Sequence, residues 1–289
     1  MHTWHWRDWE GLPYLTCSLL EPIAHGFLTQ HFWSRPLSEM TKALKPGTSV
    51  YRLKQVHGNT VLSPTEIEHR LKTGKEIDAE GNRAFVMGDG LISDNSQQAL
   101  WVASADCTPV LIADRKTGQV AAAHAGWRGT AQKIVPQAIA RLQEKGSKIS
   151  DLRIAMGPAI AGEVYQVSLN VAAQVGASIT SQSSEPQSLE FQASEFQASG
   201  TQKILSQEQE QAIVHAVQEI PNSPLLPDPE PGKIRLDVRR VNVVQMEQLG
   251  INPEQIAIAP YCTYQTPEHF FSYRRAKQKK VQWSGIIST

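Results

Sequence analysis

The chain has 289 residues and carries 28 Lys and Arg against 28 Asp and Glu, so its formal net charge is zero. A chain of this length buries roughly three quarters of its unfolded surface and can build a core without disulfides. Zero net charge argues against a general nucleic-acid-binding protein, which needs a basic excess to meet phosphates. No apolar run approaches the roughly 18 residues of a membrane-spanning helix, and the first residues lack the apolar segment of a secretory signal. We therefore expect a cytoplasmic protein with neither nucleic acid nor membrane as a partner.

The cysteine content supports the same compartment. The chain has three cysteines, Cys17, Cys107 and Cys262, which are far apart in the sequence and cannot all pair. Such a set is typical of a protein from a reducing environment and not of a disulfide scaffold.

Short apolar runs bounded by turn residues predict buried strands in several places. These runs cover residues 99–103, 109–113, 119–123, 153–156 and 255–259. Helices are predicted over about 131–142 and 237–249, the second closed by Gly250. Strands and helices mix without a regular strand–helix–strand repeat. This favours an α+β fold with mixed β-sheets covered by helices over a doubly wound parallel sheet.

The helix at 131–142 has a clear apolar face but an awkward interior residue. Its apolar residues recur at offsets of 3, 4, 7, 8 and 11 from Ala131, with Thr130 as the expected N-cap and Gly146 as the expected stop. Pro136 would lie inside this helix, so either a kink or a later start is expected.

One segment, about residues 178–232, is rich in Gln, Ser, Glu and Pro. The pentapeptide Glu-Phe-Gln-Ala-Ser occurs twice in tandem there, at 190–194 and 195–199, which is typical of an insertion in a surface loop. Residues 206–220 have the spacing of one surface helix. We interpret the chain as a single domain over 1–289 with a polar low-complexity insertion.

The densest group of chemically useful residues is His-Ala-Gly-Trp-Arg-Gly at 124–129, between a predicted strand and a predicted helix. Glycines let the backbone approach a ligand, and the N–H groups at a helix start attract anions. Arg128 adds a fixed positive charge suited to phosphate. The alternative is a tight turn with a hydrogen-bonded His124 and a surface arginine.

Two further residues stand where predicted strands end or begin. Cys107 lies in Ala-Asp-Cys-Thr-Pro at 105–109, and His57 lies in Gln-Val-His-Gly at 55–58. Each has a purely structural alternative, a small buried cysteine or a hydrogen-bonded histidine. Together with His124 they would supply two imidazoles and a thiolate, a donor set that suits a zinc site with an open fourth position. The separations of 50 and 17 residues match no zinc-finger pattern, so spacing alone makes this only a candidate.

A series of motifs resembles one family. The three motifs above are followed in order by Gly-Pro-Ala-Ile at 157–160, Cys-Thr at 262–263 and Phe-Ser-Tyr-Arg-Arg at 271–275. The series is similar to the YfiH family, also called laccase-domain or multicopper polyphenol oxidase proteins and, later, purine nucleoside phosphorylases. The resemblance covers about residues 25–275 and is interrupted by the polar insertion.

The resemblance implies a compact α+β fold and a zinc site made by His57, Cys107 and His124, which with Arg128 would form the catalytic group. It implies turnover of purine nucleosides, either by phosphorolysis of adenosine, inosine or methylthioadenosine to base and ribose 1-phosphate, or by deamination of adenosine. Three more residues are candidates for substrate binding: Asp89, Arg274 and Arg275. Asp89 would orient a ligand or only shape its turn, and the arginines would hold phosphate or belong to a solvated basic tail.

The sequence departs from the family in three places. Ala-Gly-Glu-Val-Tyr at 161–165 stands where members often have a cysteine after Gly-Pro-Ala-Ile. Thr-Gln-His-Phe-Trp at 29–33 replaces the arginine and glycines that members commonly carry, and Ala-Lys-Gln-Lys-Lys at 276–280 replaces a usual Asp and Gly-Arg pattern. None of these changes removes a proposed zinc ligand.

Three other functions remain open from the sequence. A copper-dependent polyphenol oxidase would use the same two histidines and cysteine, but the chain lacks the paired His-x-His arrays of a trinuclear copper cluster. An amide hydrolase that edits a peptidoglycan precursor would use Cys107 as nucleophile beside His124. A non-enzymatic binding protein would use a structural zinc, which normally has a fourth protein ligand.

Overall fold

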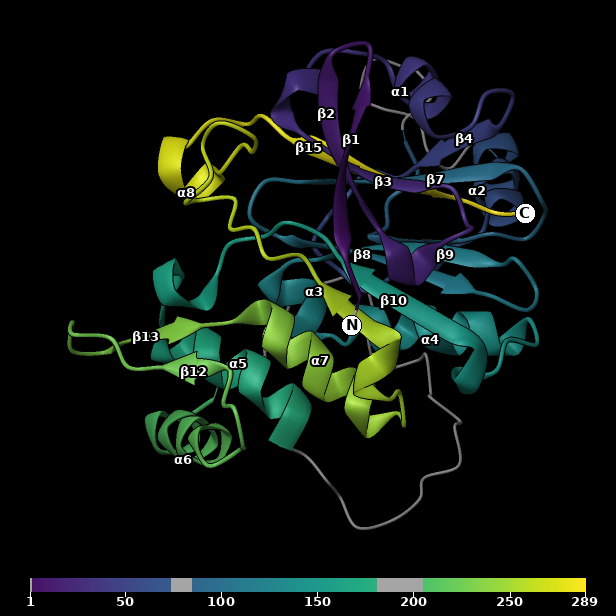
Figure 1. The fold of residues 1–289 in the computed structure, drawn as a ribbon. Helices are drawn as coiled ribbons and strands as arrows, with labels where there is room; N and C mark the ends of the chain where they lie inside the picture. The colour runs from purple at the N-terminus through teal and green to yellow at the C-terminus, as the bar shows by residue number, and fades with distance from the viewer. Residues whose placement is uncertain (1, 74–84, 181–204) are drawn as a thin grey trace.

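Two six-stranded mixed sheets stack on one another, and helices cover the outer face of the second (Figure 1). The computed structural model describes residues 2–73, 85–180 and 205–289. This architecture confirms the predicted α+β class with mixed sheets. In the part of the chain described, no helix has both the length and the hydropathy to cross a membrane.

The first sheet has the order β1-β2-β3-β15-β7-β4. Its strands are β1 (Trp4–Trp9), β2 (Leu12–Cys17), β3 (His25–Leu28), β15 (Gln282–Ile287), β7 (Gln98–Ser104) and β4 (Ser49–Arg52). Its pairs are antiparallel except β4 with β7. The last strand of the chain therefore lies in the middle of the sheet, between β3 and β7.

The second sheet has the order β14-β10-β8-β9-β6-β5. Its strands are β14 (Ile256–Ile258), β10 (Leu152–Met156), β8 (Thr108–Asp114), β9 (Val120–Ala125), β6 (Gly90–Ile92) and β5 (Val61–Leu62). The two outer pairs are parallel and the three inner pairs antiparallel. All five strands predicted from apolar runs are present, each within two residues of the expected bounds.

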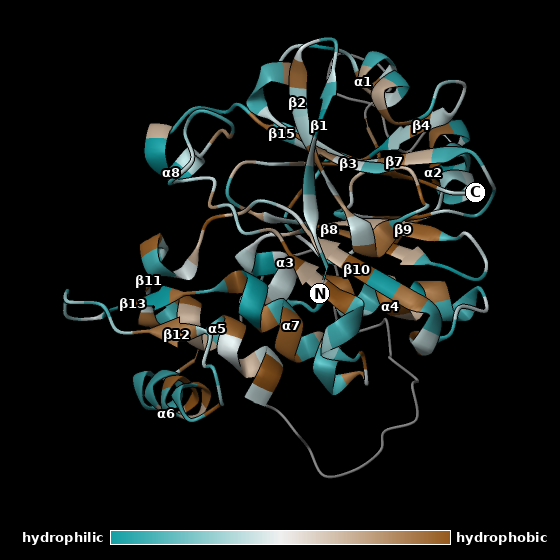
Figure 2. Cartoon of the chain, in the orientation of Figure 1, coloured by the Kyte–Doolittle hydropathy of each residue, from teal (hydrophilic) through white to brown (hydrophobic). Residues whose placement is uncertain are grey.

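Every residue of β8 and β9 is buried because this sheet is covered on both faces. Successive side chains of a strand point to opposite faces. Accordingly Leu111 and Ala113 pack toward the first sheet, whereas Val110 and Ile112 pack against the helical layer. Figure 2 shows the resulting band of hydrophobic residues along β8, β9 and β10.

The remaining elements complete the layers. The helices are α1 (Leu37–Leu44), α2 (Pro64–Lys72), α3 (Trp127–Ala131), α4 (Ile134–Glu144), α5 (Leu169–Thr180), α6 (Gln207–Gln218), α7 (Val238–Gln248) and α8 (Tyr273–Ala276). A three-stranded sheet has the order β11 (Gln166–Ser168), β13 (Lys233–Leu236) and β12 (Leu225–Leu226). It packs with α5, α6 and α7 around a separate hydrophobic cluster.

The helix predicted at 131–142 is two helices, α3 and α4, separated at Gln132 and Lys133. Lys133 is left-handed, with φ of 59°, so the chain turns there and α4 starts at Ile134. Pro136 falls in the first turn of α4, where no intrahelical hydrogen bond is lost, which confirms the later start. The N-cap prediction is wrong, because Thr130 lies inside α3 and its hydroxyl accepts a hydrogen bond from Asn242. Gly146 follows the helix end as expected.

Part of the predicted insertion belongs to the core. Its tandem pentapeptides lie outside the described residues, but α6 begins at a capping box on Ser206 and packs on α5. Val214 and Val217 are buried in the third cluster, and Gly176 of α5 lets Val217 approach closely. Residues from α6 onward are therefore structural, and the expected insertion boundary at 178–232 includes core residues. The single-domain interpretation stays a prediction.

Candidate functional site

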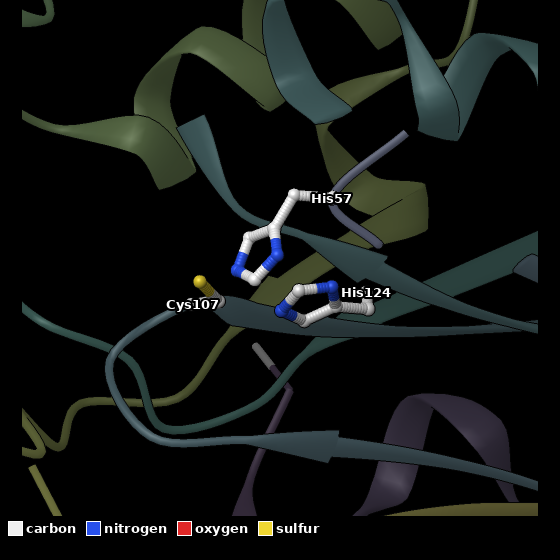
Figure 3. A group of neighbouring side chains, drawn as sticks. All are labelled: His57, Cys107 and His124. Carbon is white, nitrogen blue, oxygen red and sulfur yellow. The ribbon is translucent and has the colours of Figure 1, made fainter. Parts of the chain in front are cut away.

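The two sheets bring His57, Cys107 and His124 together from three separate segments (Figure 3). Cys107 directly precedes β8, and His124 of β9 is paired with Pro109 of β8, so hydrogen-bonded strands fix these two neighbours. His57 follows β4 across a short loop. One nitrogen of each ring and the Cys107 sulfur lie within 4.8 Å of one another. The two imidazole rings are nearly perpendicular, at 78° with centroids 4.8 Å apart.

Unusual backbone conformations flank the group. His57 has a left-handed φ of 61°, and Asp106, next to Cys107, has a φ of 93°. Non-glycine residues rarely adopt such angles, and they persist only where the surrounding structure holds them. His124 is buried, Cys107 is half-buried and His57 is exposed, so the group opens to solvent on the His57 side.

Asp89 holds both histidines through hydrogen bonds to its carboxylate. One carboxylate oxygen accepts hydrogen bonds from the His57 backbone N–H at 2.9 Å and from His124 Nδ1 at 2.9 Å. The other accepts the backbone N–H groups of Val56 and Gly58 at 3.1 and 2.8 Å. Burial raises the pKa of Asp89, but these bonds outweigh it and lower the pKa below its usual value. Both oxygens of Asp89 are thus occupied by bonds within the protein. The expected choice between orienting a ligand and shaping the turn stays a prediction.

This bond also sets the protonation of His124. A carboxylate only accepts, so His124 Nδ1 carries a hydrogen and Nε2 is left to face the group. Burial raises the pKa of the Cys107 thiol, but the charge and hydrogen bonds of His124 and His57 lower it to about 6. Burial lowers the pKa of His124, whereas the Cys107 thiolate and Asp89 raise it to about 9. Without a metal ion, the pair therefore holds a thiolate beside an imidazolium at neutral pH.

Gly126 makes room for the group. A Cβ at this position would lie 2.8 Å from the Cys107 sulfur and 3.2 Å from His57 Cδ2. The first distance is shorter than real Cβ contacts and the second is tight, so close packing and not a left-handed backbone favours glycine at position 126.

A second network holds the Cys107 turn. Asp106 is buried, and its carboxylate accepts hydrogen bonds from the Thr263 hydroxyl and the Arg274 backbone N–H, each at 2.7 Å. Its backbone oxygen accepts from Ile160 N–H. The motifs that looked separate in the sequence thus meet at Asp106. The sequence did not single this residue out, although it stands beside Cys107 in a motif already noted.

The predicted arginines lie elsewhere than expected. Arg275 donates to the backbone oxygens of Thr263, Tyr264 and Phe270, which commits its guanidinium to holding a loop. Arg274 donates to the Gln166 oxygen and stacks over the Tyr165 ring at 4.7 Å.

Arg128 is exposed on α3 and lies 4.3 Å over the Trp127 ring. It does not line the cavity beside Cys107, and its expected role in holding phosphate stays a prediction. Arg128 and Arg274 both act on Tyr165, whose pKa burial and the Cys107 charge raise to about 12. Tyr165 therefore stays a neutral hydroxyl in this part of the molecule.

A cavity of about 450 Å³ opens beside the three residues. It is lined by His57, Cys107 and His124 together with residues from three other places: the end of β4 and the residues after it, the end of β7, and the stretch from α8 to β15. A larger hollow of about 630 Å³ lies at the N-terminal end of α7, away from the three residues. The described residues contain one group of three or more His, Cys, Asp or Glu able to hold a metal ion, and it is this one.

Comparison with known proteins identifies the family. The family model described as "Multi-copper polyphenol oxidoreductase laccase" matches residues 35–206 and 200–288. The chain belongs to this family, in which YfiH proteins are found. A protein of Synechocystis sp. named purine nucleoside phosphorylase is 46% identical over 285 residues, 99% of this chain and 97% of the relative.

Solved structures agree on the fold of this YfiH-family chain. YlmD from Geobacillus stearothermophilus superposes with a TM-score of 0.71 at 21% identity, over 98% of both chains. YfiH from Bacillus licheniformis gives a TM-score of 0.67 at 20% identity, over 98% of this chain and 99% of its own. At these identities the likeness concerns the fold alone.

The donor set fits a single metal ion. Two imidazole nitrogens and a thiolate are ligands that both Zn²⁺ and copper accept. His124 donates its Nδ1–H to Asp89, the kind of hydrogen bond from the other ring nitrogen that orients metal-binding histidines. With three protein ligands and an open side toward the cavity, the group resembles a catalytic centre more than a closed structural one.

Proposed function

We propose that this chain is a zinc-dependent purine nucleoside phosphorylase with its active centre at His57, Cys107 and His124. One observation carries the proposal. The three donors converge at the end of a 450 Å³ cavity in a chain that is 46% identical, over nearly its whole length, to a protein named purine nucleoside phosphorylase. The cavity is large enough for a small ligand, for which sites of about 300–1,000 Å³ are usual.

Phosphorolysis exchanges one bond at the sugar for another. An oxygen of inorganic phosphate forms a bond to C1′ of the ribose, while the bond from C1′ to the purine nitrogen breaks. The electron pair of that bond goes to the purine, which takes up a proton, and the products are free base and ribose 1-phosphate. No oxidant or reductant is consumed.

The residues of the chain have separable roles in this scheme. His57, Cys107 and His124 would hold Zn²⁺, which supplies Lewis acidity and a fixed positive charge when bound. Asp89 keeps His124 Nε2 pointed at the centre. Asp106 holds the backbone turn that carries Cys107. Deamination of adenosine, as a second activity at the same centre, is part of the proposal and is tested in the same assay.

One competing function has a specific observation in its favour. A thiolate and an imidazolium paired at Cys107 and His124 are what a cysteine amide hydrolase uses in the absence of metal. The two functions differ in their response to chelation, because removing zinc would free the thiolate for attack but abolish a metal-dependent reaction. A multicopper oxidase would need further copper ligands, and the described residues offer one metal group.

The test is to incubate purified protein with adenosine, with and without phosphate, and to analyse the products. We expect adenine and ribose 1-phosphate only when phosphate is present, and inosine with ammonia if deamination also occurs. The His57→Ala, Cys107→Ala and His124→Ala variants should lose turnover, while His69→Ala, an exposed histidine on α2, should keep it. Identical products with and without phosphate, and no ribose 1-phosphate, would contradict the proposed phosphorolysis.

A further inference from the structure

The cavity beside the metal-binding group has one strongly cationic side. Four of its lining residues are basic, Arg52, Lys54, Lys279 and Lys280, and they are here called the cationic wall. The described lining contains no Asp or Glu. The wall comes from two segments, the end of β4 and the stretch between α8 and β15. Four like charges gathered in one concave place repel one another, an arrangement that is stabilised when an anion enters.

The charges of the wall have no carboxylate partner among the described residues. Within the described part of the chain, none of the four side chains forms an ion pair with a carboxylate. Arg52 is the clearest case. Its guanidinium is half-buried, and among described residues it makes no hydrogen bond but stacks 3.7 Å over Phe85 and 5.6 Å from the Trp283 ring. Burial lowers the pKa of Arg52, as expected for a desolvated cation.

A neutral hydrogen-bonding group also lines this cavity without a partner. Ser104, the last residue of β7, is 3% exposed, and its hydroxyl has no hydrogen-bond partner among the described residues. Buried hydroxyls are normally hydrogen-bonded, so an unpartnered one in a cavity wall points to a ligand atom. Gln55 does not compete for it, because its amide is bonded to the backbone of Ala103.

We propose that Arg52, Ser104, Lys279 and Lys280 form a subsite for a phosphoryl group next to the metal-binding residues. A planar guanidinium held by aromatic stacking presents its donors to phosphate oxygens in a fixed orientation. The lysines add charge, and the serine hydroxyl adds a neutral donor. The inference deepens the proposed function, on which its catalytic meaning rests. It assigns phosphate binding to the end of β4 and the segment between α8 and β15, and not to Arg128 on α3.

The phosphoryl group can have two sources, which binding measurements separate. It is either inorganic phosphate, the second substrate of phosphorolysis, or a 5′-phosphate on the nucleoside itself. The probes are sodium phosphate, adenosine 5′-monophosphate and adenosine, each titrated into the full chain by calorimetry. We expect at least one of sodium phosphate and adenosine 5′-monophosphate to bind about tenfold more tightly than adenosine, the probe without phosphate. This advantage should shrink as NaCl rises from about 0.05 to about 0.5 M.

The variants test which residues supply the subsite. Lys279→Gln combined with Lys280→Gln, and separately Arg52→Gln, should weaken the phosphate-bearing probe about tenfold while changing adenosine affinity by less than about twofold. Ser104→Ala should weaken the same probe several-fold without lowering the unfolding midpoint, because its hydroxyl loses no partner within the described chain. Lys148→Gln, at an exposed lysine away from the cavity, is the control and should change nothing.

The pattern of losses identifies the source. Loss for inorganic phosphate assigns the subsite to the second substrate, and loss for adenosine 5′-monophosphate alone assigns it to a phosphorylated nucleoside. If all three sets of variants bind both phosphate-bearing probes as tightly as the wild type does, the subsite does not exist. These are binding results, so they stand apart from the product analysis, whose failure would remove the phosphorolysis but not the phosphoryl subsite.

Discussion

Replacement of Asp89 by Asn separates the orienting role of this residue from its contribution to stability. The carboxylate accepts four hydrogen bonds, two at each oxygen. An asparagine has one acceptor oxygen and a donating NH₂ group, which would face two N–H donors whichever way it is placed. A buried donor left unpaired costs about 1–3 kcal/mol. Since three of the four donors are only partly buried, we expect a total loss of about 2–4 kcal/mol in unfolding free energy.

The zinc measurement is the decisive part of this prediction. Loss of the partner that orients a metal-binding histidine typically lowers metal affinity by about 10–100-fold. We therefore expect Asp89→Asn to lose zinc to a chromogenic chelator at a chelator concentration about 10–100-fold lower than for the wild type. Its unfolding midpoint in urea should also be lower than that of the wild type. Asp94→Asn is the matched control. Asp94 also accepts a backbone N–H, from Thr65, and a side-chain amide, from Gln98, but touches no histidine of the centre.

Asp94→Asn should therefore lower stability and leave zinc affinity unchanged. If Asp89→Asn binds zinc as tightly as wild type, while both variants unfold early, Asp89 only shapes its turn. That result would refute the argument that it orients His124.

Three further predictions follow from the geometry. Cys107 is half-buried and its thiol pKa is lowered to about 6, whereas Cys17 and Cys262 are buried. Cys107 should therefore be alkylated fastest after zinc is chelated and should be protected when zinc is bound. Mass spectra that show the same labelling of Cys107 with and without zinc would contradict this. Gly126→Ala places a methyl 2.8 Å from the Cys107 sulfur and should abolish zinc retention, while Gly58→Ala, whose added methyl meets nothing closer than 3.7 Å, should keep it in elemental analysis. Val217→Ala removes buried methyls from α6 and should lower the urea unfolding free energy by about 1–3 kcal/mol, whereas a value near zero would make α6 a surface decoration after all.

Much of the fold could be predicted because local patterns and tertiary packing agree. The apolar runs of β7 to β10 are short and bounded by turn residues, and nearly all residues of those strands are buried. The prediction failed where a local signal was ambiguous. Thr130 has the residue type of an N-cap, but burial against Asn242 of α7 decides its position, and that partner is 112 residues away.

Composition and packing differ in one part of the predicted insertion. Polar composition marks residues 178–232 as a loop, but only a few apolar side chains, such as Val214 and Val217, are needed to anchor α6 on α5. Composition averages over a segment, so only the helical spacing within 206–220 indicated so sparse an apolar face. Small residues such as Gly176, which permit the close approach, give no signal in the sequence alone.

At the site, residue chemistry in the sequence indicated the donors but not their surroundings. His57, Cys107 and His124 were candidates by type, and the structure brings them together. The roles of Asp89, Asp106 and Arg52 depend on partners distant in sequence, which spacing does not reveal. The sequence motif of Arg128 suggested an anion contact, but it gave no sign that the exposed side chain stacks over Trp127.

X-ray absorption at the zinc edge, on protein purified without added metal, tests the central claim most directly. The account predicts stoichiometric zinc with one sulfur neighbour at about 2.3 Å and two imidazole nitrogens at about 2.0–2.1 Å. The sulfur shell should vanish in Cys107→Ser. Copper in place of zinc, or a zinc shell that keeps its sulfur in Cys107→Ser, would contradict a zinc centre made by His57, Cys107 and His124.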